Sequence, residues 1–133
     1  MPQVGIVLVS HSARLAEGAA DLAAQVSGGL VTIIAAGGTD DGGLGTSAAL
    51  IADGLRRADS GAGVLVVPDL GSAVLTVRAL LADPPDDIRP VSVVLADAPF
   101  VEGAVAGTVA AAAGADLKAA AAAAEEAWHA RKL

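Results

Sequence analysis

The chain of 133 residues is 54% hydrophobic but only 2% aromatic, and its formal net charge is −7. This length predicts one domain spanning residues 1–133. The absence of cysteine excludes disulfides and thiolate metal sites. The two histidines, His11 and His129, are too few for a multi-histidine zinc site in one subunit, so we expect no metal and no cofactor.

Charge and hydropathy also limit the partners and the location of the protein. No run of Lys or Arg is present to neutralise phosphates, which disfavours nucleic-acid binding. No uncharged apolar stretch reaches the roughly 20 residues of a membrane span, and the N-terminus lacks the pattern of a signal peptide. We therefore expect a cytoplasmic protein that binds neither nucleic acid nor membrane.

Strands and helices alternate along the chain. The first strand, 4–9, is apolar on both faces, which is typical of a strand buried in a parallel sheet. Residues 12–27 predict an amphipathic helix, with inward positions at Leu15, Ala19, Leu22 and Val26. The same patterns predict buried strands at 30–36, 64–68 and 91–96, and helices that begin at Thr46-Ser47, after Ser72, at Phe100 and at Asp116.

The last predicted helix contains the alanine run 119–124. Low complexity often indicates disorder, but alanine is the best helix former, so we interpret the run as ordered helix with a fraying end. Asp116 is the expected N-cap. We expect Trp128 to pack this helix against the body or a partner, and His129 to be a solvated surface residue.

The alternation predicts an α/β fold with a parallel sheet of four strands in the order 2-1-3-4 and helices on both faces. The pattern leaves room for an extra edge strand. In this order the winding reverses between the first and third strands, so a crevice opens at the carboxyl edge of the sheet. His11 follows the first strand and Asp69 follows the third. The topology therefore brings together two residues that lie far apart in the sequence.

A carboxylate beside a histidine holds one ring nitrogen in its N–H form and aims the other at an electrophile. Helix starts supply backbone N–H groups that suit a phosphoryl group. The structural alternative is a histidine that packs or caps and an aspartate that caps a helix. Their pairing across the crevice favours phosphoryl transfer, with His11 and Asp69 as catalytic residues. The groups expected to stabilise the phosphoryl group are Ser10, Ser12, Gly37, Thr46, Gly71 and Ser72.

Other catalytic motifs are missing from the sequence. It has no GxxxxGK[ST] P-loop, no GxGxxG after a strand and no GxSxG nucleophile elbow. Asp40-Asp41, in the glycine-rich loop 37–45, offers a site for a divalent ion, but two adjacent exposed aspartates more often belong to a solvated loop. Ordinary nucleotide-binding and serine-hydrolase functions are therefore unsupported.

Five segments, mostly at the predicted strand ends, form a set. They are Val9–Ser12 with Arg14–Gly18, Ala35–Gly37, Gly45–Thr46, Pro68–Ala73 and Ala98–Ala104. Together they resemble the phosphotransferase subunit of PTS-dependent dihydroxyacetone kinases, which belongs to the mannose-type enzyme IIA domain family. The resemblance extends over essentially the whole chain. It implies that His11 accepts the phosphoryl group, that Asp69 orients it and that the protein is a homodimer.

The resemblance also implies a route for the phosphoryl group. Phosphocarrier protein HPr, charged from phosphoenolpyruvate by enzyme I, would phosphorylate His11. His11 would then pass the group to ADP held on the nucleotide-binding kinase subunit, which phosphorylates dihydroxyacetone. Some relatives carry fused phosphocarrier and enzyme I domains, whereas this chain ends at Leu133, so the donor is expected to act in trans.

Two other functions stay open. The chain could be the IIA component of a mannose-type sugar phosphotransferase system, in which His11 feeds a IIB protein. It could also be a non-enzymatic module whose phosphorylation alters binding to a partner. Sugar-transport relatives usually have glycine directly after the histidine and a longer glycine-rich segment after the aspartate. Here Ser12 follows His11, and Leu70–Ala73 follow Asp69, which favours the kinase branch.

Overall fold

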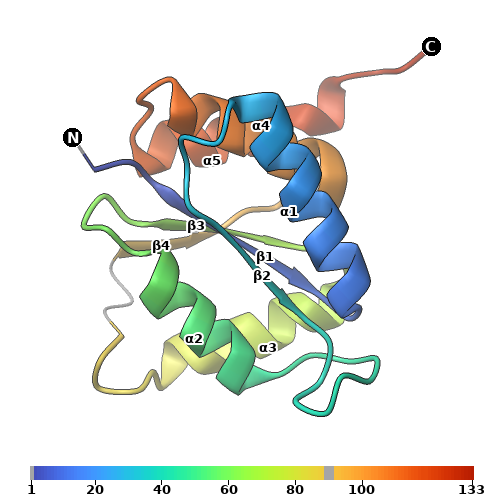
Figure 1. The fold of residues 1–133 in the computed structure, drawn as a ribbon, viewed down its shortest axis with the longest axis vertical. Helices are drawn as coiled ribbons and strands as arrows, with labels where there is room; N and C mark the ends of the chain where they lie inside the picture. The colour runs from blue at the N-terminus through green and yellow to red at the C-terminus, as the bar shows by residue number, and fades with distance from the viewer. Residues whose placement is uncertain (1, 89–91) are drawn as a thin grey trace.

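The computed structural model describes residues 2–88 and 92–133, and Figure 1 shows a central sheet with helices on both faces. Four parallel strands lie in the order β2-β1-β3-β4, which confirms the predicted α/β topology. Within the described residues the sheet has no fifth strand. The strands are β1 (Gly5–Ser10), β2 (Ile33–Gly37), β3 (Val64–Pro68) and β4 (Val93–Leu95). The helices are α1 (Ala13–Ser27), α2 (Ala48–Ala58), α3 (Gly71–Ala82), α4 (Phe100–Ala112), α5 (Leu117–Glu126) and the short 3-10 helix η2 (Ala127–His129).

Three of the helices begin at a side-chain cap. The side chains of Ser12, Ser47 and Asp116 each accept a hydrogen bond from the backbone N–H three residues on, at the starts of α1, α2 and α5. The predicted N-cap at Asp116 is therefore confirmed. Helix α1 ends at Gly28, whose φ of 80° is the left-handed conformation that glycine adopts at helix ends.

Two cores cover the two faces of the sheet. Ile6 and Leu8 of β1 belong to the core shared with α1, α4 and α5, whereas Val7 and Val9 belong to the core shared with α2 and α3. Figure 1 shows these two helix layers on opposite sides of the strands. Because successive side chains of a strand point to opposite faces, every residue of β1 is buried, as the sequence predicts.

Small residues let α4 approach the sheet and α5 closely. A Cβ added at Gly107 of α4 would lie 2.8 Å from Leu65 Cδ2, and one added at Gly103 would lie 2.8 Å from Ala98 Cβ. Ala120 and Ala124 of α5 are buried in the same layer. The alanine run is therefore ordered helix, and close approach of backbones replaces the large aromatic anchors that the chain lacks.

The C-terminal turn closes over the connection between β4 and α4. Trp128 Nε1 donates a hydrogen bond to the carbonyl oxygen of Asp97 at 2.9 Å, so Trp128 does pack against the body, although its side chain is 59% exposed. Glu125 accepts a hydrogen bond from the Asp97 backbone N–H at 3.1 Å. His129 is exposed, as predicted.

The edge strands are shorter and less buried than predicted. Strand β2 begins at Ile33 instead of Leu30, Leu30 is 67% exposed, and Ala36 is the one fully buried residue in β2. The fourth strand covers Val93–Leu95, and the first residue predicted for it lies outside the described residues. β2 and β4 are the edge strands of the sheet, so each pairs with one neighbour only.

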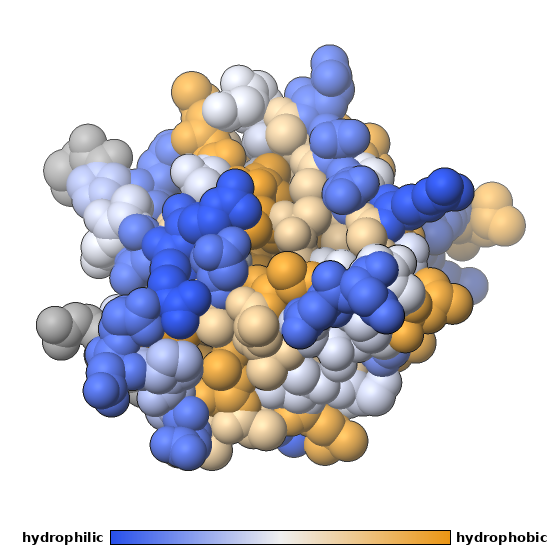
Figure 2. Space-filling model, turned by 60° about the horizontal axis from the view of Figure 1, so that its bottom comes forward, coloured by the Kyte–Doolittle hydropathy of each residue, from blue (hydrophilic) through white to orange (hydrophobic). Residues whose placement is uncertain are grey.

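The predicted inward face of α1 is wrong at three of four positions. Ala19 is buried, but Leu15, Leu22 and Val26 are 44%, 46% and 54% exposed. The face that packs inward consists of alanines, because α1 lies close to the sheet and to α4. Figure 2, with the α2 and α3 face turned forward, shows further apolar side chains at the surface between hydrophilic ones. Ala48, the first residue of α2, is also exposed.

Candidate functional site

The ends of β1 and β3 bring His11 and Asp69 together. The two strands are neighbours and end at the same edge of the sheet, so the residues that follow them meet. His11 Nδ1 lies 2.9 Å from Asp69 Oδ1. The His11 side chain is 24% exposed and that of Asp69 is 7% exposed. The juxtaposition predicted from the topology is present, with the imidazole reachable from solvent and the carboxylate beneath it.

The Asp69 carboxylate is held by its neighbours. Its Oδ2 accepts the Ser10 hydroxyl at 2.9 Å and the His11 backbone N–H at 3.0 Å, and its Oδ1 accepts the Leu70 backbone N–H at 2.7 Å. Burial acts to raise the pKa of Asp69, but the hydrogen bonds from His11, Ser10 and Leu70 outweigh it and hold the pKa below 3.8. Asp69 is therefore an anion at neutral pH, and an anion only accepts hydrogen bonds.

The outer ring nitrogen of His11 faces the start of α3. Because Asp69 only accepts, we assign the ring proton to Nδ1, which leaves the lone pair on Nε2. Ser72 Oγ lies 2.5 Å from Nε2, so the hydroxyl donates to that lone pair. The N-cap residue of α3, Leu70, makes no side-chain hydrogen bond to the helix. The first N–H groups of α3 and the positive end of its dipole therefore lie beside this nitrogen.

Ser10, Ser12 and Gly37 support the site from below. The buried Ser10 hydroxyl donates to Asp69 and accepts the Ser12 backbone N–H at 3.0 Å. The Ser12 hydroxyl caps α1. A Cβ added at Gly37 would lie 2.4 Å from the Ser12 carbonyl oxygen, so the end of β2 packs directly on the His11 turn. In this structure the three residues shape the site, and their direct contact with a phosphoryl group stays a prediction.

Thr46 belongs to the loop before α2, and Gly71 begins α3. Thr46 Oγ1 lies 2.8 Å from Thr76 Oγ1, and the Thr76 hydroxyl donates to the Ser72 carbonyl oxygen at 3.2 Å. Gly71 is the exposed first residue of α3. Thr76 was missed by sequence reasoning, although it lies four residues after Ser72 and so shares its helix face.

The comparisons with known proteins identify the family of the chain. The family model EIIA-man, described as PTS system fructose IIA component, matches residues 5–121. The chain belongs to the EIIA-man family. The predicted resemblance to this family is therefore confirmed.

This EIIA-man chain also has relatives with more specific names. It is 37% identical over 106 residues to "PEP-dependent dihydroxyacetone kinase 2, phosphoryl donor subunit DhaM" of Listeria innocua, covering 80% of this chain and 84% of that protein. It is 39% identical over 117 residues to the corresponding DhaM of Escherichia coli, covering 86% of this chain but 25% of that much longer protein. The crystal structure of the unknown-function protein EF1359 matches with a TM-score of 0.82 and 36% identity, over 94% of this chain and 95% of that one.

The acidic loop of the EIIA-man chain has its own hydrogen bonds. Asp41 accepts the Thr39 hydroxyl at 2.5 Å and the Gly43 backbone N–H at 3.2 Å, and Asp40 accepts the Ser47 hydroxyl. Within residues 2–88 and 92–133, no group of three or more His, Cys, Asp or Glu side chains is placed to hold a metal ion. In the same part of the chain, no helix combines the length and hydropathy required to cross a membrane.

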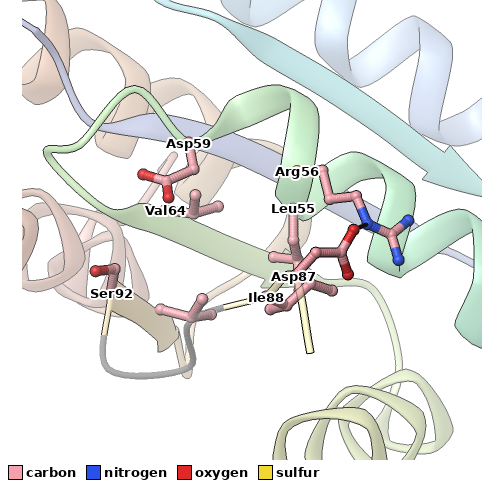
Figure 3. Close-up of a pocket in the computed structure, with 8 residues that line it drawn as sticks. Leu55, Arg56, Asp59, Val64, Asp87, Ile88 and Ser92 are labelled. Atoms are coloured by element: carbon pink, nitrogen blue, oxygen red, sulfur yellow. Dashed lines mark hydrogen bonds and ion pairs between the residues drawn. The ribbon is translucent and has the colours of Figure 1, made fainter. Parts of the chain in front are cut away.

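A pocket lies at the end of the sheet opposite the His11–Asp69 pair. Its volume is about 320 Å³, and its lining includes Val64 and Val93, the first residues of β3 and β4. Figure 3 shows Arg56 reaching toward Asp87 across its rim, and Arg56 Nε lies 2.5 Å from Asp87 Oδ2. The hydrogen bond from Arg56 holds the pKa of Asp87 below 3.8. The pocket faces away from the carboxyl edge, where ligands bind in open α/β sheets.

Proposed function

We propose that this chain carries a phosphoryl group on His11 Nε2, taking it from phosphocarrier protein HPr and delivering it to ADP on the nucleotide-binding subunit of a dihydroxyacetone kinase. The observation that carries the proposal is a solvent-reachable imidazole paired with a buried, hydrogen-bonded carboxylate at the carboxyl edge of the sheet. The names of the Listeria and Escherichia relatives, phosphoryl donor subunits of dihydroxyacetone kinases, support this acceptor.

In the first half-reaction, the lone pair of Nε2 attacks phosphorus while the bond from phosphorus to the donor breaks, and the electron pair of that bond leaves with the donor. Nδ1 keeps its proton throughout, and the Asp69 carboxylate offsets the positive charge that develops on the ring. In the second half-reaction, a terminal phosphate oxygen of ADP attacks phosphorus. The N–P electron pair then returns to Nε2, so the ring is regenerated unchanged.

Ser72 has a different role before and after transfer. Its hydroxyl donates to the Nε2 lone pair at rest, so it must turn away before the N–P bond forms. It is then placed to donate to a phosphoryl oxygen. The backbone N–H groups of Gly71 and Ser72, which have no partner within α3 because they begin it, offer further donors near the same charge.

A second candidate is the IIA component of a sugar phosphotransferase system. The description of the matching family model as a fructose IIA component favours it. The chemistry on His11 would be identical, and only the acceptor, a IIB protein, would differ. The two candidates are therefore separated by the discharge step alone.

We also propose that the protein acts in the cytoplasm as a homodimer. The exposed stripe Leu15, Leu22 and Val26 of α1 supports a contact with a second copy, because these side chains follow one helix face. Sedimentation of the wild type is expected to give a dimer, and Leu22→Lys is expected to give a monomer. A monomeric wild type at micromolar concentration would contradict the dimer.

Incubation with phosphoenolpyruvate, enzyme I and HPr tests the carrier function. The wild type is expected to gain one acid-labile phosphate that is absent from His11→Ala and retained by the control variant His129→Ala. Addition of the ADP-loaded kinase subunit and dihydroxyacetone is then expected to discharge the label. A wild type that stays unlabelled with competent donors contradicts the carrier function. Discharge to a IIB protein instead supports the second candidate.

A further inference from the structure

Two threonine hydroxyl groups tie the loop before α2 to α3. Thr46 Oγ1 lies 2.8 Å from Thr76 Oγ1, and the Thr76 hydroxyl donates to the carbonyl oxygen of Ser72 at 3.2 Å. A hydroxyl has one proton to donate. Because Thr76 gives its proton to Ser72, Thr46 is the donor in the bond between the two threonines. The hydrogen bonds therefore run in one direction, from Thr46 through Thr76 to Ser72.

The same loop, residues 38–47, is also bonded to the backbone of His11. The Gly45 N–H donates to the carbonyl oxygen of His11 at 2.8 Å, and the Ser72 hydroxyl lies 2.5 Å from His11 Nε2. Hydrogen bonds and the covalent chain together form a closed ring between the carbonyl group and the imidazole of His11. Its members are Gly45, Thr46, Thr76 and Ser72. Figure 1 shows this loop at the end of the sheet where α1 and α3 begin. A network whose members are all bonded holds one geometry.

The place of Thr46 in this ring differs from a direct contact with the phosphoryl group. In the structure its proton goes to Thr76, and the hydroxyl next to Nε2 belongs to Ser72. We propose that Thr46 and Thr76 are positioning residues, whose hydrogen bond holds the first turn of α3 so that the Ser72 hydroxyl faces the nitrogen that takes the phosphoryl group. The inference rests on the function proposed above.

The position of Ser72 matters because its hydroxyl has to change partner during transfer. It leaves Nε2 before the N–P bond forms and then donates to a phosphoryl oxygen. Thr76 holds the backbone carbonyl of Ser72, which leaves the Ser72 side chain free to turn about a fixed backbone. A misplacement of about 1 Å in a positioning group can cost about 100-fold in rate. Loosening one hydrogen bond of the ring is expected to cost less, about tenfold.

Variants of Thr76 separate its hydroxyl from its shape. Thr76→Val removes the hydroxyl at nearly constant volume and is expected to lower the maximal rate of His11 labelling by phosphorylated HPr about tenfold, or about 1.4 kcal/mol. The half-saturating concentration of HPr is expected to stay unchanged, because the defect lies in the reacting geometry. Thr76→Ser keeps the hydroxyl and is expected to restore most of the rate.

Thr108→Val is the matched control for the loss of a threonine hydroxyl. Thr108 is buried in α4, and its Oγ1 has no hydrogen-bond partner among the described residues. This variant is expected to keep the wild-type labelling rate. Equal maximal rates in Thr76→Val and Thr108→Val overturn the proposal.

Double variants distinguish positioning from direct contact. Thr46→Val and the double variant Thr46→Val/Thr76→Val are expected to match Thr76→Val, because residues of one network do not act additively. In a Ser72→Ala background, Thr76→Val is expected to slow labelling less than twofold further. A full tenfold further loss there overturns the proposal. A Thr46→Val defect that exceeds that of Thr76→Val and multiplies with Ser72→Ala assigns Thr46 a direct contact and also overturns it.

Nitrogen-15 NMR of the His11 imidazole tests the ring without any phosphoryl donor. The Nε2 signal of Thr76→Val is expected to move from the wild-type position toward that of Ser72→Ala, which lacks the hydroxyl donor. An unchanged signal overturns the proposal. If circular dichroism shows that Thr76→Val is misfolded, Thr46→Val, in the loop, takes its place in both measurements. A wild type that phosphorylated HPr does not label on His11 contradicts the proposed function, whereas a labelled wild type with equally fast Thr46→Val and Thr76→Val contradicts this inference alone.

Discussion

Asp69 and Asp87 lie at opposite ends of the sheet. Each carboxylate lies close to a side-chain nitrogen, of His11 and of Arg56 respectively, but the surroundings of the two pairs differ. Asp69 is 7% exposed and accepts hydrogen bonds from His11, Ser10 and Leu70. Asp87 is 61% exposed and pairs with Arg56, itself 38% exposed. An exposed pair is weakened by solvent and salt, whereas a buried network fixes one geometry. A short contact therefore identifies a site only when burial and further hydrogen bonds hold it.

The largest effect is expected from removing the charge of Asp69, the buried carboxylate of the two. Asp69→Asn is expected to slow labelling of His11 about 100-fold, because the amide no longer holds the proton on Nδ1 or offsets the charge of the ring. Asp87→Asn is the matched control and is expected to keep the wild-type rate. Stopped-flow labelling by HPr, with circular dichroism to verify the fold, measures both. A wild-type rate in Asp69→Asn would remove this carboxylate from the mechanism.

The next effect concerns the crowded backbone beneath His11. Gly37→Ala would bring a Cβ to 2.4 Å from the Ser12 carbonyl oxygen, so β2 or the His11 turn must shift. We expect the free energy of unfolding to fall by about 1–3 kcal/mol. Gly18, within α1, has open space around it, and Gly18→Ala is expected to stabilise by about 0.5–1 kcal/mol. Urea unfolding measures both, and equal midpoints would show that the turn is not crowded.

At low pH, the difference in unfolding free energy between the wild type and Asp69→Asn is expected to disappear. The pKa of Asp69 is held below 3.8 by its hydrogen bonds, so its contribution to stability is fully present above the unfolded value and is lost as the pH falls through the folded value. The unfolding free energies of the wild type and Asp69→Asn are therefore expected to differ by a constant amount above about pH 5 and to converge below about pH 4. A difference in unfolding free energy that grows as the pH falls would mean that folding raises the pKa of Asp69 and does not lower it.

The smallest effect is expected at the exposed pair. A double-mutant cycle with Arg56→Ala and Asp87→Ala should give an interaction free energy of about 0.2–1 kcal/mol, which falls as salt is added. Thermal unfolding at low and high ionic strength provides the measurement. A salt-independent coupling of several kcal/mol would mean that the pocket lined by Arg56 and Asp87 is as well organised as the His11 site.

The central part of the fold and the principal pair of the site could be predicted from the sequence. Strands β1 and β3 are continuous apolar runs, and the alternation of strands and helices leaves few topologies. The order 2-1-3-4 then places the residues after β1 and β3 at one edge, which is why His11 and Asp69 could be paired. The helix cap at Asp116 followed from local chemistry alone.

Only the tertiary structure determined which face of α1 is buried and which side chains pair by hydrogen bonds. Apolar spacing showed that α1 has an apolar stripe, but its packing on the sheet and α4 buried Ala16 and Ala23 and left Leu22 exposed. The support of Asp69 by Ser10 and the closure of the β4–α4 connection by Trp128 depend on the three-dimensional packing. The reason is physical: the sequence determines periodicity and local caps, whereas the orientation of a helix and the partner of a hydroxyl depend on residues distant in the chain.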